Sequence, residues 1–352
     1  MKKISLFLAA ALMVLACACN RDAKQSSANG DNNFAFLAKL GINMDSVNVF
    51  DKKLAEDTVT PTMALDEKQR VALLNQVHRF DVYPEVEGLC FILGVKAVGH
   101  GHTLVVYLTE YGDGSEESMA IYDSEGKLTD FIQTGPWDAM APQEANDDYT
   151  AGTALKWKAE CEFTSADEFV LNSSYADVAW KMGADDKGEP GPIEVTDSKW
   201  EILKKYRYKI DEAGHFVFLG RDEQRKGPVD AEDVILDDIE DVAMLPVSSE
   251  ARLDSINSKC VRYAKQPGEM VKFSLSSIMW RIYNSNPQQV LNYIAAHRDA
   301  PTEVQKLMES IVSDGNMDKA ILVGDIKKMT DAGARAYLEQ LTAQWGVAGA
   351  KG

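Results

Sequence analysis

The sequence predicts an α+β protein in which an antiparallel β domain is followed by a helical domain. Between residues 89 and 220, nine short runs rich in β-branched and aromatic residues alternate with Gly, Asp and Ser turn formers, which is typical of antiparallel meanders. After residue 245, apolar residues recur at three- and four-residue spacings, which is typical of amphipathic helices. The nine runs fit a β-sandwich or a small closed barrel, followed by a C-terminal helical bundle.

Changes in composition divide the chain into segments. From the N-terminus we expect a signal peptide at 1–16, a polar tether at 17–33, a mostly helical or irregular segment at 34–80, an antiparallel β domain at 81–228, an acidic connector at 229–244 and a helical domain at 245–352. The sharpest change lies at the acidic connector, where like charges predict an extended, solvated stretch.

The first twenty residues, MKKISLFLAAALMVLACACN, have the order of a secretory signal. Lys2 and Lys3 precede an apolar core that ends in small residues and cysteine, and the core is too short to span a bilayer. The residues Val14-Leu15-Ala16-Cys17 resemble the lipobox of bacterial lipoproteins. In that family the cysteine thiol is acylated and the signal is removed before it.

Two cysteines compete for the lipid. Lipoboxes favour a branched aliphatic residue three places before the cysteine, and Val14 fulfils this for Cys17, whereas the alternative Cys19 has Ala16 there. The resemblance implies an outer-membrane lipoprotein of the Gram-negative cell envelope. Its N-terminal acyl chains (palmitate among them) would hold it to the membrane, since two or more chains anchor stably. It does not indicate which face of the outer membrane the protein occupies.

The N-terminal segment predicts two helices. A short one is expected at 34–40, followed by an irregular connection at 41–64. Asp66 precedes EKQRVALLNQVHRF, so we expect it to cap a helix whose buried face carries Val71, Leu74 and Val77.

Within the β domain, the stretch Trp157–Phe163 alternates polar and apolar residues, as a half-exposed strand does. Two turns share one pattern, an apolar residue followed by Asp-x-x-Gly, at Asp123 to Gly126 and at Asp211 to Gly214. We expect hairpins in which both glycines have positive φ.

The helical domain predicts a compact antiparallel bundle. Its first helix should bury Leu253, Ile256 and Cys260, and FSLSSIMWRIY (273–283) should be buried on nearly all sides. Pro287 and Pro301 suit the first position of the next two helices. A last helix is expected from Asp331 to Trp345.

Charge and cysteine content narrow the function classes. The formal charge of −18 disfavours nucleic acid as a partner. Beyond the signal remain Cys90, Cys161 and Cys260. One disulfide is compatible with an oxidising envelope, but Cys90 and Cys161 stand in apolar strand contexts that favour buried free thiols.

Two local clusters could bind metal. His100-Gly101-His102 could hold one ion if Glu110, Asp113 or a third histidine came close, although a polar hairpin turn explains the pair more simply. The acidic run in 229–244 lacks the spacing of an EF-hand loop. We therefore expect no metal and no cofactor.

Catalytic motifs are absent from the sequence in the forms that we tested. It contains no G-x-S-x-G, H-E-x-x-H, phosphate-binding loop or dinucleotide fingerprint. This favours a non-enzymatic binding or assembly component, with another envelope protein or a glycan as partner, and leaves catalysis open. The alternative is a glycan-binding or glycan-hydrolysing protein that uses aromatic residues of the β domain. These residues are Trp137, Trp157, Trp180, Trp200, Tyr107, Tyr122, Tyr206 and Tyr208. Packing in the core would also explain their presence.

Overall fold

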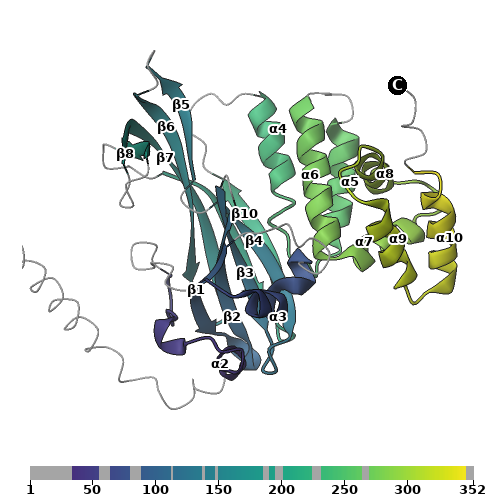
Figure 1. The fold of residues 1–352 in the computed structure, drawn as a ribbon, viewed down its shortest axis with the longest axis horizontal. Coiled ribbons are helices and arrows are strands. Elements are labelled where there is room, and N and C mark those ends of the chain that lie inside the picture. The colour runs from purple at the N-terminus through teal and green to yellow at the C-terminus, as the bar shows by residue number, and fades with distance from the viewer. Residues whose placement is uncertain are drawn as a thin grey trace, which may run out of the picture.

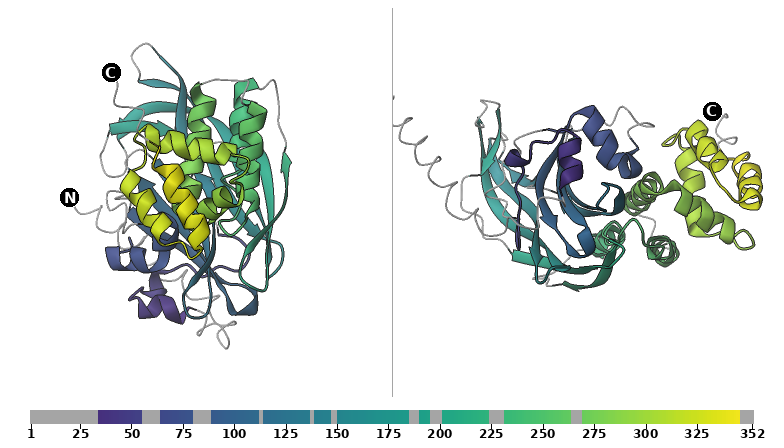
Figure 2. Two further views of the ribbon diagram at one scale, coloured as in Figure 1. Left: turned by 90° about the vertical axis from the view of Figure 1, so that its right-hand side faces the viewer. Right: turned by 90° about the horizontal axis from the view of Figure 1, so that it is seen from below.

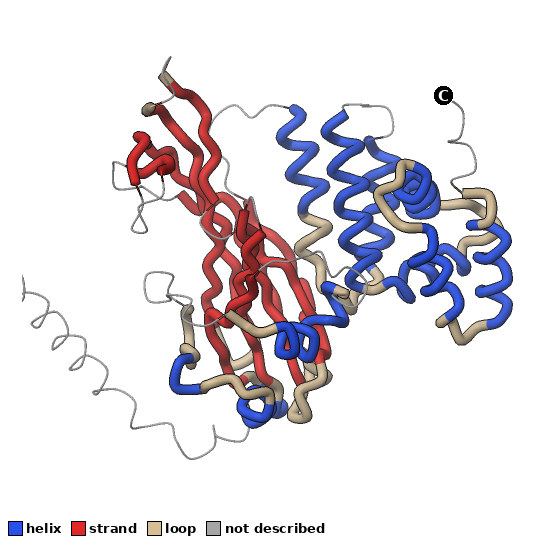
Figure 3. The backbone as a smooth tube through the Cα atoms, viewed as in Figure 1, coloured by secondary structure: helices blue, strands red, loops and turns tan. Residues whose placement is uncertain are grey.

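The predicted α+β architecture is confirmed in the computed structural model. It describes residues 34–54, 64–79, 89–111, 114–136, 139–146, 150–184, 190–194, 201–223, 231–263 and 269–345. Strands occupy one part of the molecule and helices α4–α10 the other (Figures 1 and 3). The predicted signal peptide at 1–16 and the candidate lipid-attachment residues Cys17 and Cys19 lie outside the described residues.

The strands form two antiparallel sheets. The first has the order β1-β2-β3-β4, with β1 at Leu89–Ala97, β2 at Thr103–Tyr111, β3 at Gly114–Tyr122 and β4 at Leu128–Pro136. The second has the order β10-β9-β7-β6-β5, and β8 pairs with β7. Its strands are β5 at Ala139–Ala145, β6 at Ala151–Phe163, β7 at Glu168–Ala184, β8 at Pro190–Glu194, β9 at Glu201–Ile210 and β10 at Phe216–Glu223.

The two sheets pack face to face as a sandwich. Alternate side chains of the first sheet meet alternate side chains of the second in one apolar core: Leu104, Val106, Leu108, Met119, Ile121 and Ile132 against Cys161, Phe163, Phe169, Leu171, Tyr206, Tyr208 and Phe216. This alternation is what the period of two in the sequence requires.

The other face of the first sheet is covered by two helices, α2 at Ala35–Lys39 and α3 at Glu67–His78. The Tyr122 hydroxyl donates to the carbonyl of Leu73 on α3 at 3.0 Å, and it lies 2.9 Å from the hydroxyl of Tyr107. Asp66 caps α3 in a capping box with Gln69, as predicted for this helix start. A short 3₁₀ turn, η1 at Met44–Ser46, follows α2.

The remaining helices form a bundle beside the sandwich (Figure 2). They are α4 at Ala231–Glu240, α5 at Ala251–Tyr263, α6 at Glu269–Ser285, α7 at Pro287–Ala296, α8 at Glu303–Ser313, α9 at Lys319–Lys327 and α10 at Ala332–Thr342. They share a second apolar core. Leu253, Ile256 and Cys260 are buried in it, as predicted.

Both Asp-x-x-Gly turns are confirmed. Gly126 has φ +84° and Gly214 has φ +77°. Asp123 and Asp211 each accept backbone N–H groups two and four residues further on, so each carboxylate fixes its own turn.

Several element predictions were wrong. The runs 168–175 and 178–183 form one strand, β7. Strands β5 and β8 were not predicted, because they contain proline, which the pattern rules assign to loops and which edge strands tolerate. Helix α9 was also not predicted. Pro301 does not take the first position of α8, because Thr302 is the N-cap and the helix begins at Glu303.

Two predicted burials were also wrong. Val71 is 38% exposed, and Leu73 is buried in its place. Each three-residue step turns the helix about 60° short of a full turn, so Val71 and Val77 cannot both face the sheet squarely. Phe273 on α6 is 68% exposed.

The acidic connector is helical, not extended. Residues 231–240 form α4, and Ile239 is buried in the bundle core. Like-charge repulsion is relieved because Asp238 and Asp241 pair with cations. Asp238 lies 2.8 Å from Lys259 and 3.2 Å from Arg262, and Asp241 pairs with Lys204 and Arg221.

Cys90, Cys161 and Cys260 are buried free thiols, which agrees with the expectation for the first two. Among the described helices, none combines the length and apolar character needed to cross a membrane.

Candidate functional site

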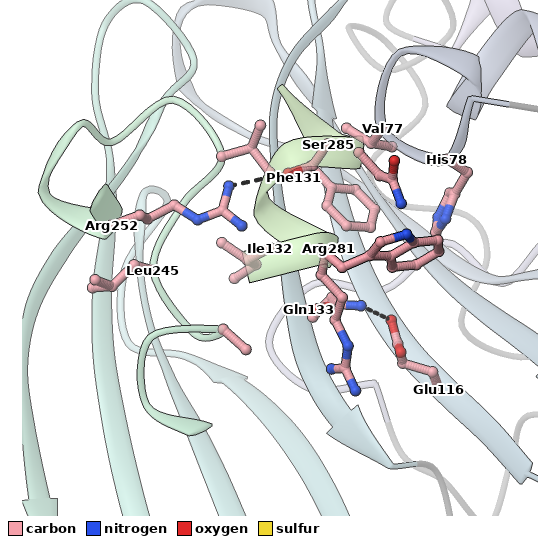
Figure 4. A pocket seen from close by; sticks show the side chains of 14 residues that line it. Val77, His78, Glu116, Phe131, Ile132, Gln133, Leu245, Arg252, Arg281 and Ser285 are labelled. Atoms are coloured by element: carbon pink, nitrogen blue, oxygen red, sulfur yellow. Dashed lines mark hydrogen bonds between the residues drawn. The ribbon is translucent and has the colours of Figure 1, made fainter. Parts of the chain in front are cut away.

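A cavity of about 320 Å³ lies where the sandwich meets the bundle. Its walls come from both parts of the molecule (Figure 4): Val77, His78, Glu116, Phe131, Ile132, Gln133, Ala243, Leu245, Val247, Arg252, Trp280, Arg281, Asn284 and Ser285. Volumes of this order and positions between packed units are typical of small-molecule sites.

Each wall follows from local structure. Strand β4 is the edge of the first sheet, so side chains from both of its faces reach the cavity. Helix α6 contributes two neighbouring pairs at four-residue spacing, Trp280 with Asn284 and Arg281 with Ser285. Residues four apart lie on the same side of a helix, and therefore α6 presents one continuous polar and aromatic strip to the sandwich.

Arg252 is the buried cation of the cavity. Arg252 is 4% exposed, and its Nη1 donates to the Ser285 hydroxyl oxygen at 3.3 Å. Burial lowers the pKa of Arg252 to about 10, and the charge of Asp130 opposes this shift. The guanidinium therefore stays protonated at neutral pH.

Asn284 lines the same cavity and is 5% exposed. Neither its Oδ1 nor its Nδ2 has a hydrogen-bond partner in the part of the chain that the structure describes. Within that part of the chain, Arg252 Nε also has no hydrogen-bond partner. Buried amides are almost always hydrogen-bonded, so these groups stand out.

Glu116 and Gln133 line the side of the cavity that lies across from Arg252 (Figure 4). Gln133 Nε2 donates to Glu116 Oε1 at 2.5 Å. Burial raises the pKa of Glu116, whereas nearby Arg281 and the bond from Gln133 counteract the rise.

His78 enters the cavity from the end of α3. Burial lowers its pKa to about 4, so the ring is neutral at pH 7. The ring meets Phe131 edge-on, with centroids 5.5 Å apart.

The Ser285 hydroxyl donates to the carbonyl of Ile282 at 3.0 Å rather than to a general base. The arrangement is therefore suited to binding by hydrogen bonds and charge.

Among the described residues, the candidate pair His100 and His102 is not joined by a third metal ligand. His100 lies in the 3₁₀ turn η3 (Gly99–Gly101) with φ +58°, and His102 Nδ1 lies 3.3 Å from the Gly99 carbonyl oxygen. Glu110 is eight residues further along β2, roughly 26 Å away at the usual rise of a strand. Asp113 lies outside the described residues. Within those residues, no group of three or more His, Cys, Asp or Glu side chains could hold a metal ion.

Most of the described aromatic side chains that the glycan alternative would use are buried in the core. Tyr107, Tyr122, Tyr206, Tyr208 and Trp180 are buried. The Trp180 Nε1 donates to the Thr153 carbonyl at 2.9 Å. Trp137, Trp200 and the side chain of Trp157 lie outside what the structure describes.

Sequence reasoning did not identify the cavity, whose lining residues are spread from 77 to 285. One signal was present. Arg252 lies four residues before Ile256 and eight before Cys260, and thus falls on the apolar stripe of its helix. A charged residue on such a stripe is buried with a partner or faces a cavity.

Comparisons with protein-family models, curated proteins and solved structures give no match for this chain.

Proposed function

We propose that this chain is a lipid-anchored protein of the Gram-negative cell envelope that binds a small molecule, without transforming it, in the cavity between sandwich and bundle. The observation that carries the proposal is Asn284, whose buried amide has both polar atoms unpartnered within the described part of the chain. Each such group costs about 1–3 kcal/mol. A ligand that supplies one donor and one acceptor would recover that free energy.

The walls of the cavity support this function. Val77, Phe131 and Leu245 supply apolar surface beside a few polar groups, and this mixture is typical of ligand sites. The walls also come from three apolar cores, with Ile132 in the sandwich core, Val77 and Phe131 in the core under α3, and Trp280 packed against the bundle core. A ligand there would therefore contact both parts of the molecule.

The test of binding is native mass spectrometry of the protein purified from the envelope. We expect the wild type to retain a small molecule that Asn284→Leu and the cavity-filling Ala243→Trp lose. Asn292→Leu is the matched control, because Asn292 is exposed on α7. No retained molecule, or equal retention by Asn284→Leu and wild type, would contradict the proposal.

The anchor rests on the resemblance of residues 14–17 to a lipobox. We expect the N-terminal peptide of the mature protein to begin at acylated Cys17. Cys17→Ser should release the protein from the membrane fraction, whereas Cys19→Ser should not. The reverse pattern would assign the lipid to Cys19, and release by neither variant would refute the anchor.

The assembly role and the glycan alternative receive less support. Cross-linked capture of the native protein, with the Cys17→Ser, Cys19→Ser double variant as control, checks for an envelope partner that depends on the anchor. Glycan binding on the β domain would need exposed rings, and Tyr107, Tyr122, Tyr206, Tyr208 and Trp180 are buried.

A further inference from the structure

The cavity contains one buried guanidinium among the described residues, that of Arg252. The Arg252 side chain has no carboxylate within ion-pair distance among the described residues, and its hydrogen bond goes to a neutral hydroxyl, that of Ser285. Taking a cation out of water is costly unless it is paired. Arg252 is therefore poised to receive a negative charge.

The nearest acid cannot supply that charge by direct contact. Asp130 accepts four hydrogen bonds: the backbone N–H groups of Phe131, Phe216 and Ser248, and the Ser248 hydroxyl, at 2.8 to 3.0 Å. Its lone pairs are occupied by these donors. It influences Arg252 through space only.

The other acid of the cavity is also engaged. Glu116 is bonded to Gln133 and feels the charge of Arg281, and it lies across the cavity from Arg252 (Figure 4). Its charge is balanced locally, so the Arg252 side of the cavity is positive inside a protein whose formal charge is −18.

We infer that the ligand carries a carboxylate, which binds Arg252 and the Asn284 Nδ2 together. This inference rests on the proposed function and names the ligand class of the same cavity. The Arg252 fork and an amide N–H are suited to a carboxylate. Asn284 Oδ1 then requires a donor, so the ligand bears an N–H or O–H group close to its carboxylate.

The charges favour a monovalent anion. A phosphate dianion would meet one uncompensated guanidinium, so its second negative charge would stay unpaired in the cavity. The apolar walls formed by Val77, Phe131 and Leu245 suit a hydrocarbon side chain. Small N-acylated amino acids combine these features and serve as probes.

The experiment compares N-acetyl-leucine with N-acetyl-leucinamide, which differ only in the carboxylate. Binding to the full mature chain in detergent is measured by isothermal titration calorimetry, and the Nε–Hε resonance of Arg252 is followed by NMR. We expect the acid to bind at least about tenfold more tightly than the amide, as one charge-assisted contact implies. The Arg252 resonance should shift with the acid.

Variants assign the effect to the residue. Arg252→Met should remove the preference for the acid, and Arg252→Lys should keep part of it, because the charge remains while the fork is lost. The exposed Arg298 provides the control Arg298→Met, which should leave the preference unchanged. The acid-to-amide comparison on wild type needs no variant, so a misfolded variant does not remove the test.

The outcomes separate the two proposals. If the amide binds as tightly as the acid and its binding is lost in Asn284→Leu, the cavity remains a ligand site and the carboxylate inference is wrong. If neither probe binds and the wild type also retains no molecule from the envelope, both proposals are wrong. If neither probe binds although a retained molecule is found, the carboxylate inference stands only if that molecule is an acid, and a neutral one overturns it.

Discussion

Single residues at turns carry constraints that the sequence shows only in part. Gly214 has φ +77°, and an added Cβ would lie 2.4 Å from Cδ2 of His102. Gly315 has a similar φ of +76°, but none of the described heavy atoms comes within 4 Å of an added Cβ. The pair therefore separates the cost of the backbone conformation from the cost of the clash.

We expect Gly315→Ala to lower the free energy of unfolding by about 1–2 kcal/mol, the cost of a left-handed conformation. Gly214→Ala should lower it by at least about 1 kcal/mol more, because the His102 ring must also move. Urea unfolding of both variants measures the difference. Equal losses would show that the ring yields without cost.

His78 makes stability depend on pH. Burial lowers its folded pKa to about 4, below the ordinary value of 6.5, because it disfavours the charged ring. Above pH 6.5 the ring is neutral in both the folded and the unfolded chain, so protonation of His78 does not lower the free energy of unfolding. As pH falls from 6.5 to 4, only the unfolded chain takes up the proton, so stability falls.

The loss from His78 should reach up to about 3 kcal/mol at pH 4, given 1.36 kcal/mol for each pKa unit. The measurement is the free energy of unfolding at several pH values between 7 and 4 for wild type and His78→Gln. The variant should show a shallower decline, and the exposed His297→Gln should follow the wild type. Parallel curves for wild type and His78→Gln would argue against a buried neutral ring.

At the scale of elements, α3 is joined to the bundle by a buried ion pair. Arg79, at the end of α3, places Nη2 2.9 Å from Oδ1 of Asp325 on α9, and their side chains are 7% and 2% exposed. The Tyr283 hydroxyl donates to the other Asp325 oxygen at 2.8 Å. The pair lies next to the cavity, since Val77 and His78 precede Arg79.

Without Arg79, the buried Asp325 carboxylate keeps one cation, the exposed Lys328, whose Nζ lies 3.3 Å from Oδ1. Its buried partner is lost, and a buried charge without such a partner is costly. We expect Arg79→Ala to lower the free energy of unfolding by about 3–5 kcal/mol. Lys306→Ala, which breaks the exposed Lys306–Glu303 pair, should cost less than about 1 kcal/mol. Urea denaturation of both proteins decides, and similar small losses would mean that the Arg79 site is open to water.

The sequence was most informative where the signal was local. The cap at Asp66, the glycines of both Asp-x-x-Gly turns and the apolar stripe of α5 were all predicted, because each depends on residues a few positions apart. Helix α4 was not predicted, because the acid Asp238 on it is paired with cations that lie more than twenty residues further along the chain, Lys259 and Arg262. The cavity was not predicted for the same reason: Glu116, Arg252 and Asn284 meet only through tertiary packing.

At the scale of the whole molecule, three carboxylates join sandwich and bundle. Asp325 binds Arg79. Asp241 accepts from the Tyr206 hydroxyl at 2.9 Å and pairs with Lys204 and Arg221. Asp130 on β4 holds the start of β10 and the segment that leads into α5. Although the chain is strongly acidic, each of these three carboxylates has cations or hydrogen-bond donors as partners at the junction of sandwich and bundle.

Asp130 connects this junction to the cavity, and its substitution should change two properties in opposite directions. Asp130→Asn retains the shape but replaces one carboxylate oxygen by an NH2 group. The acceptor is then lost either for the N–H groups of Phe131 and Ser248 or for the Phe216 N–H and the Ser248 hydroxyl. We therefore expect a loss of about 2–4 kcal/mol of unfolding free energy. Ser248→Ala, which removes one of the four bonds, should cost about 1 kcal/mol.

Asp130→Asn also removes the negative charge that acts electrostatically on Arg252. N-acetyl-leucine should then bind to Asp130→Asn a few-fold more tightly than to wild type, because the guanidinium is less compensated. Calorimetric titration below the unfolding temperature of the variant measures this. Tighter binding by a less stable protein would show that Asp130 balances the cavity charge as well as the fold, whereas weaker binding would mean that Asp130 only positions Arg252.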